Sequence, residues 1–161
     1  MVRRLLASAV IMLLLMAPAP LRAAGTWAWP VHGAIVRGYD PPDAPYGAGH
    51  RGIDIAAPPG TVVVSPAAGV VTFAGPVGGR LFVTIDHGGG VVSTGSWLTS
   101  LLVRKGDQVV MGQPIATTGW GHPDLAVPHL HLGVRLDGEY VDPLDYLGPP
   151  PITDLIRLAP L

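Results

Sequence analysis

Short apolar segments separated by glycine and proline run through most of the chain. They span residues 34–39, 61–64, 69–75, 81–86, 91–94, 109–110 and 114–118. Their β-branched residues and the turn-forming residues between them are typical of strands. No helical periodicity of useful length precedes the C-terminus. The pattern therefore predicts an all-β fold, a compact antiparallel β-sandwich or barrel-like domain with little helix.

The N-terminal segment has a different pattern. Residues 1–4 include two arginines, residues 5–16 are almost wholly apolar, and residues 17–24 are small and proline-containing. This three-part order is typical of a secretory signal peptide. The apolar run is short for a membrane span. Residues 1–24 are therefore predicted to be a signal peptide, with a retained anchoring helix as the alternative.

Composition favours one exported domain after that segment. The chain has no cysteine, a net charge of −1 and only 13% charged residues, which argues against a nucleic-acid partner or a polybasic membrane surface. Residues 25–148 are predicted to form a single β domain. A proline-rich tail at residues 149–161 follows, with one or two helical turns expected at 152–158. We expect a secreted or cell-envelope protein without a stable membrane span after signal cleavage.

Two histidines lie on the last strongly apolar segment, residues 127–134. The apolar and β-branched residues that follow Pro128 predict a strand. Residues two apart on a strand point to the same face. His129 and His131 should therefore project together, with Leu130 and Leu132 on the opposite face.

A second pair of candidate ligands lies earlier in the chain. His50 and Asp54 are four residues apart, and the glycines and isoleucines around them favour an extended segment. An even spacing puts both side chains on one face. Imidazole nitrogen and carboxylate oxygen are suitable zinc ligands, and three protein ligands plus a water are typical of a catalytic zinc site.

The residues around both pairs resemble a known family. Residues 49–63 resemble the first signature of the lysostaphin- and LytM-type zinc endopeptidases of bacterial cell walls, and residues 128–132 resemble the second. Residues 66–71 and 105–115 add to the resemblance, which runs from about Trp29 to Leu147. It implies a metallopeptidase-like β domain of the duplicated hybrid motif type.

The resemblance also implies roles for individual residues. His50, Asp54 and His131 would hold one zinc per chain, and His129 would act as the catalytic base or acid. His129 lies one strand repeat from His131, about 6–7 Å along the chain, which suits proton transfer better than a fourth ligand position. The implied substrate is the peptide cross-link of peptidoglycan.

One position departs from the family pattern. Active relatives usually carry a further histidine before a Val-x-x-Gly-Asp turn, and alignment on residues 103–107 puts Trp97 there. An indole can donate a hydrogen bond but cannot shuttle a proton. His122, in the glycine- and proline-rich loop before the ligand strand, should border the site. Trp97 and His122 are therefore candidate substrate contacts, although the loop position of His122 favours a simple exposed residue. His32 and His87 are predicted to be structural.

Three functions remain open from the sequence. The first is an exported zinc metalloendopeptidase acting on peptidoglycan. The second is a catalytically weak or inactive member of the same fold that binds cell wall or regulates another wall hydrolase, an alternative that Trp97 favours. The third is a phosphate-carrier or lipoyl-like β domain, suggested by the turn at residues 105–113 and disfavoured by the export signal.

Overall fold

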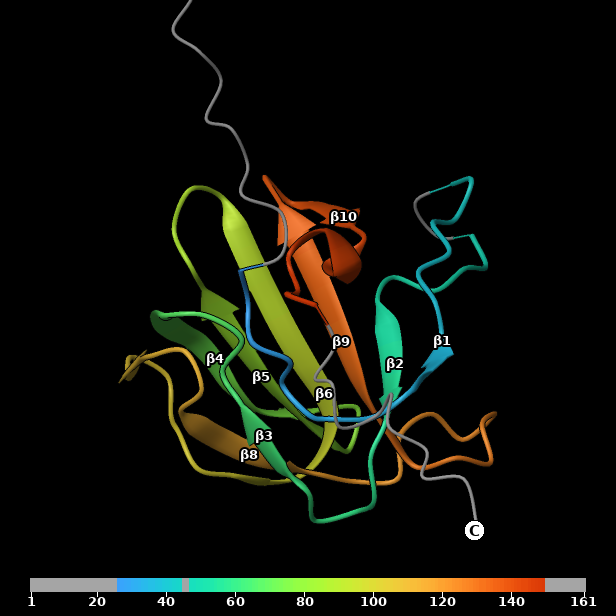
Figure 1. Ribbon diagram of the computed structural model, residues 1–161, viewed down its shortest axis with the longest axis horizontal. Helices are drawn as coiled ribbons and strands as arrows, with labels where there is room; N and C mark the ends of the chain where they lie inside the picture. Colours follow the sequence, from blue (N-terminus) through green and yellow to red (C-terminus); the bar gives the residue numbers. More distant parts are fainter. Residues whose placement is uncertain (1–25, 45–46, 150–161) are drawn as a thin grey trace, which may run out of the picture.

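The computed structural model describes residues 26–44 and 47–149, and ten strands lie within them (Figure 1). In chain order the strands are β1 (Ile35–Arg37), β2 (Ile53–Ala56), β3 (Val62–Val64), β4 (Gly69–Val77), β5 (Arg80–Asp86), β6 (Val91–Leu101), β7 (Gln108–Val109), β8 (Pro114–Thr118), β9 (His129–Leu136) and β10 (Glu139–Val141). Every strand pair is antiparallel. The predicted all-β, antiparallel fold with little helix is confirmed.

Helix is confined to one short turn in the described part of the chain, the 3-10 helix η1 (Pro143–Asp145). No helix within residues 26–44 and 47–149 is long and apolar enough to cross a membrane. The predicted signal peptide, residues 1–24, lies outside the described residues. So do the helical turns expected at 152–158 and all of the predicted tail except Pro149.

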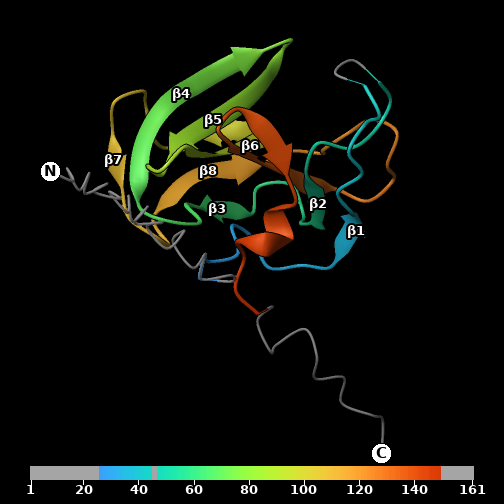
Figure 2. The same ribbon diagram turned by 90° about the horizontal axis from the view of Figure 1, so that it is seen from above.

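The strands form one sheet that folds over on itself. Its main path runs β1-β2-β9-β6-β5-β4-β7, while β10 pairs with β9 and the β3–β8 pair joins through β6. In the view of Figure 2, β3 and β8 form a layer below β4, β5 and β6. The hydrophobic core fills the space that this fold encloses, with aliphatic side chains such as Val63, Val83 and Ile115 almost fully buried.

Strand β6 connects the two layers. Its first half, up to Ser96, pairs with β5 and β9, and from Leu98 onward it pairs with β8. The backbone turns at Trp97, which has a φ of 63°. A local irregularity of this kind bends a strand and redirects its side chains. The position flagged by the family pattern is therefore also the place where the sheet changes direction.

Two features of the strand pattern differ from the sequence prediction. Strand β6 continues to Leu101 rather than ending near residue 94, because neighbouring strands supply hydrogen-bond partners to its glycine- and serine-containing second part. Strand β10 was not predicted. It follows β9 through Asp137 and Gly138, both at positive φ, which is the Asp-Gly hairpin turn.

Candidate metal centre

Strands β2 and β9 place the His50–Asp54 pair beside the His129–His131 pair. Asp54 on β2 is directly opposite His131 on β9 in the strand register. The approach is close at Gly52, where a side chain would overlap the backbone of Leu132 and the His131 ring. His50 precedes β2 and is anchored by a backbone bridge to Asp40. Residues distant in the sequence therefore meet on one face of the sheet.

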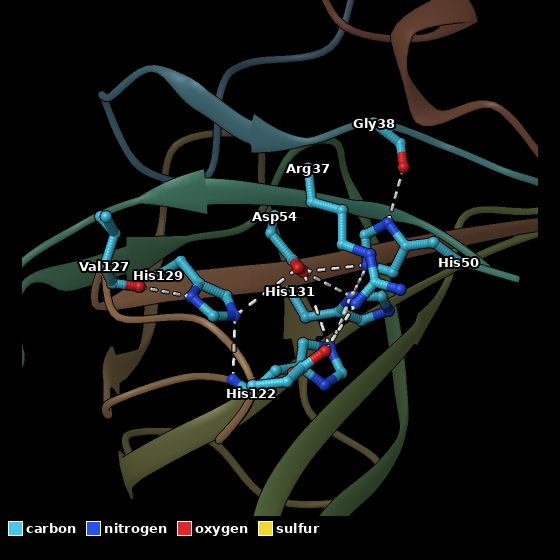
Figure 3. A network of polar contacts seen from close by, with 9 residues as sticks. Arg37, Gly38, His50, Asp54, His122, Val127, His129 and His131 are labelled. Atoms are coloured by element: carbon cyan, nitrogen blue, oxygen red, sulfur yellow. Dashed lines mark hydrogen bonds and ion pairs between the residues drawn. The ribbon is translucent and has the colours of Figure 1, made fainter.

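Three donor atoms converge at this point (Figure 3). His131 Nδ1 lies 2.8 Å from Asp54 Oδ1, and His50 Nε2 lies 3.1 Å from the same oxygen. The two imidazole nitrogens are 3.0 Å apart. His50 and Asp54 are buried, and His131 is partly exposed. The sequence-predicted ligand residues are thus brought together in a largely buried cluster that reaches the surface through His131.

The backbone orients the His50 ring toward the cluster. Its Nδ1 is 2.7 Å from the carbonyl oxygen of Gly38. A carbonyl can only accept, so Nδ1 carries the proton and donates it, which leaves the lone pair of Nε2 directed at Asp54 and His131. Metal-binding histidines are commonly oriented in this way by a carbonyl or carboxylate on the other ring nitrogen.

The electrostatics of Asp54 suit a cation. Burial alone would raise the pKa of this carboxyl, but the hydrogen bond from His131 and the neighbouring imidazoles outweigh it and hold the pKa below its usual range. Asp54 Oδ2 is buried and makes no hydrogen bond to any described residue. A buried carboxylate oxygen without a partner is costly. A metal ion among these atoms would satisfy several lone pairs at once, so the residues fit a zinc site.

His129 is fully buried beside the three donors. Its Nδ1 donates a hydrogen bond to the carbonyl of Val127 at 2.7 Å. Its Nε2 accepts one from the backbone N–H of His122 at 2.9 Å and lies 3.6 Å from Asp54 Oδ2. His129 therefore lies next to the cluster without joining it, a position compatible with the predicted proton-transfer role.

His122 lies closer to the cluster than a substrate contact requires. Its Nε2 is 3.3 Å from His131 Nδ1 and 3.7 Å from Asp54 Oδ1. The donor atoms of His50, Asp54, His122 and His131 all lie within 4.8 Å of one another. Burial lowers the pKa of His122 with help from the neighbouring imidazoles, against the opposing charge of Asp54. A neutral imidazole at this place can donate a lone pair to a metal.

The sequence pattern put His122 at the border of the site but did not place it among the candidate ligands. The available signal was a histidine inside the loop 119–127, which leads directly into the ligand strand. How far that loop folds back over the strand depends on tertiary contacts, so its sequence alone could not reveal the distance.

Trp97 forms part of a cleft next to the cluster. Its ring centroid is 4.8 Å from that of His122, and the guanidinium carbon of Arg80 lies 5.1 Å from the indole centroid. These residues and the highly exposed Trp120 line a cleft of about 330 Å³. Aromatic walls beside a cation are suited to binding an extended, partly apolar ligand.

The family model for peptidase family M23 matches residues 48–143, more than half of the chain. The chain belongs to this family. The match includes both predicted metal signatures, and it confirms the resemblance to lysostaphin- and LytM-type peptidases. It also decides against the phosphate-carrier or lipoyl-like alternative.

Among solved M23-type structures, the chain is similar to a zinc containing peptidase from Vibrio cholerae, with a TM-score of 0.61, 29% identity and coverage of 80% of this chain and 41% of that one. It is also similar to the catalytic domain of lysostaphin from Staphylococcus simulans, with a TM-score of 0.59, 26% identity and coverage of 70% and 90%.

Some relatives of this chain are not named peptidases. The chain is 39% identical to a lipoprotein NlpD/LppB homolog from Pseudomonas aeruginosa over 78% of this chain and 41% of that protein. It is 32% identical to the murein hydrolase activator NlpD of Escherichia coli over 76% and 31%. The chain spans less than half the length of these two relatives, so family membership alone does not separate a peptidase from a regulator.

Proposed function

We propose that this protein is an exported zinc metalloendopeptidase that cleaves peptide cross-links of bacterial peptidoglycan. One zinc per chain would be held by His50 Nε2, Asp54 Oδ1 and His131 Nδ1. The observation that carries the proposal is the convergence of these three atoms to within 3.1 Å of one another, with the His129 imidazole beside them.

The chemistry divides between the metal and the chain. Bound zinc would polarise a scissile carbonyl and lower the pKa of water toward about 7. Proton transfer would be carried out by a side chain of the protein. His129 keeps its Nδ1 proton on the Val127 carbonyl, so Nε2 is the atom that would take a proton and return it to the leaving amine. His122 must withdraw its backbone N–H before that nitrogen is available.

Substrate and location rest on the relatives and the sequence. One relative is named a murein hydrolase activator and lysostaphin is named an antimicrobial peptidase, and other relatives are named lipoproteins. The cleft beside the cluster, with Trp97, Trp120 and Arg80, would bind the peptide. The pattern at residues 1–24 supports an extracytoplasmic location, secreted or in the cell envelope.

A second candidate function is a weak or inactive member of the fold that binds cell wall or regulates another wall hydrolase. Trp97 favours it, because the side chain at the expected histidine position cannot transfer a proton. The name of the E. coli relative points the same way. The complete set of His50, Asp54, His129 and His131 opposes it, since a degenerate site would be expected to lose ligands.

Metal analysis followed by a peptidoglycan assay tests the proposal. The exported chain should carry close to one zinc, and Asp54→Ala and His131→Ala should each lose it. His129→Ala should keep zinc but lose hydrolysis by about 10²–10⁴-fold, because it removes proton transfer and no ligand. Hydrolysis is measured as new amino groups released from purified peptidoglycan, with a chelator as a further control.

Two results would contradict the proposal in different ways. Full zinc affinity in both ligand variants would place the metal elsewhere. A zinc-loaded wild type that releases no more amino groups than His129→Ala, across several wall types, would leave the binding or regulatory function in place of the peptidase.

A further inference from the structure

We propose that His122 is a fourth protein ligand of the metal, so that the loop 119–127 closes the centre in the resting protein. A three-ligand site leaves one position open for water. In this structure the imidazole of His122 faces that position (Figure 3). The inference rests on the proposed metal site formed by His50, Asp54 and His131, but it does not depend on peptidase activity.

The donor separations agree with a four-ligand centre. Zinc holds nitrogen and oxygen ligands at about 2.0–2.2 Å, so neighbouring corners of its tetrahedron are about 3.3–3.6 Å apart. His122 Nε2 lies 3.3 Å from His131 Nδ1 and 3.7 Å from Asp54 Oδ1. The edges among the other three donors measure 2.8–3.1 Å. Two of the three edges to His122 are therefore close to the tetrahedral value, and the third, to His50 Nε2, is within 4.8 Å.

Neighbouring rings hold the His122 imidazole in this place. It stacks on His129, with 5.5 Å between ring centroids and 17° between planes, and Trp97 packs on it at 4.8 Å. Its own side chain is only 25% exposed. A loop histidine that pointed to solvent by chance would not be held between two rings. The packing gives the ring one orientation, which is what a metal ligand requires.

The same loop also blocks His129. The backbone N–H of His122 donates to His129 Nε2, the atom proposed to transfer protons. In the closed loop, the His122 side chain fills a ligand position and the His122 backbone N–H blocks Nε2 of His129. Both would be released together if the loop moved away, so closing and opening would act as one switch on the site.

An ion pair ties the loop to strand β1. Asp124 pairs with Arg37 on β1 at 3.2 Å; the Asp124 side chain is exposed and that of Arg37 is partly exposed. Exposed ion pairs of this kind contribute little stability. Opening of the loop would therefore mainly break the hydrogen bond and ring contacts that His122 makes, and a substrate or partner that binds the adjoining cleft could replace these contacts.

Zinc-edge X-ray absorption of the wild-type protein tests the inference directly. We expect three imidazole ligands in wild type and two in His122→Ala, with one zinc per chain in both. Zinc affinity, measured by competition with a chromophoric chelator, should fall at least about tenfold in His122→Ala, the lower end of what loss of an outer-shell partner costs. His32→Ala, which removes an exposed histidine, is the matched control and should change neither reading.

The outcomes separate this inference from the proposed function. Two imidazoles in zinc-loaded wild type, with unchanged affinity in His122→Ala, would overturn the fourth-ligand role and leave the three-ligand site intact. A wild type that binds no zinc would overturn both. The number of imidazole ligands in the wild-type protein tests the inference without any variant. The test therefore remains valid even if His122→Ala folds poorly.

Discussion

Trp97 shows how one residue can serve two structural demands. It carries a φ of 63° at the point where β6 leaves β9 and turns toward β8. A bulky residue seldom adopts positive φ, and histidine is found there more often. Its indole meanwhile packs on His122 and lies beneath Arg80. The backbone position is therefore one that the family histidine could occupy, while the side chain supports the closed loop.

Replacing Trp97 by histidine tests whether this residue limits activity. Trp97→His supplies an imidazole that can donate and accept protons, and it removes the indole that packs on His122. Both changes should raise the rate of peptidoglycan cleavage, within the roughly 10²–10⁴-fold range of a general acid–base group. The rate is measured as amino groups released per zinc-loaded chain.

Trp97→Phe is the control for this experiment, because it keeps an aromatic ring without a proton-transfer group. Equal gains in Trp97→His and Trp97→Phe would mean that loosened packing, and not the new imidazole, changed the rate. No gain in Trp97→His would show that another feature limits the site.

At the scale of elements, the loop 119–127 depends on Gly121. This residue has a φ of 83°, and a Cβ there would overlap the imidazole of His129. The loop can therefore approach strand β9 only because no side chain intervenes. Gly121, which has no side chain, thus allows His122 to reach both the cluster and His129.

Gly121→Ala should destabilise the closed loop. The free energy of unfolding, measured by urea denaturation, should fall by about 1–3 kcal/mol from backbone strain together with the overlap. Gly112→Ala is the matched control, because Gly112 has a similar φ of 80° but open space where the Cβ would lie. A loss in Gly112→Ala as large as that in Gly121→Ala would show that strain alone accounts for it, and that contact with His129 is unimportant.

At the scale of the whole molecule, His87 links segments that are distant in the sequence. Its Nδ1 donates to the carbonyl of Ala68 at 2.8 Å, its Nε2 accepts from the Ser93 hydroxyl at 2.7 Å, and Trp27 packs on the ring. These contacts use both nitrogens of a neutral ring. They agree with the sequence prediction that His87 is structural.

Acid should weaken the fold through His87. Burial lowers its pKa, against smaller opposing effects of the Ala68 carbonyl and Asp86. Between this lowered pKa and the unfolded value of about 6.5, the unfolded chain binds more protons. Stability from His87 is therefore complete above about pH 7 and is lost as the pH falls through that window.

Urea unfolding at about pH 7.5 and pH 5.5, with a chelator present so that metal release does not contribute, measures this effect. The free energy of unfolding should fall less with acid in His87→Gln than in wild type, because glutamine does not titrate. Parallel losses in the two proteins would assign the acid sensitivity to other groups.

The sequence by itself determined most of the strands and the two pairs of candidate site residues. Alternation in residues 129–134 put His129 and His131 on the face opposite Leu130 and Leu132, and the structure buries both leucines in the core. The spacing of His50 and Asp54 likewise put two candidate ligands within reach of each other. Such relations are local: strand periodicity and turn residues act over a few positions, so they can be read without knowing the fold.

Only the tertiary structure decided how far β6 extends and where His122 lies. Strand β6 continues through Gly95 and Ser96, which have weak strand preference, because β5 and β9 supply their hydrogen bonds. The loop 119–127 reaches the cluster because Gly121 allows contact with His129 and because three aromatic rings pack together. These contacts join residues from separate strands and loops, and their free energy exists only once the sheet has folded, so no local pattern encodes them.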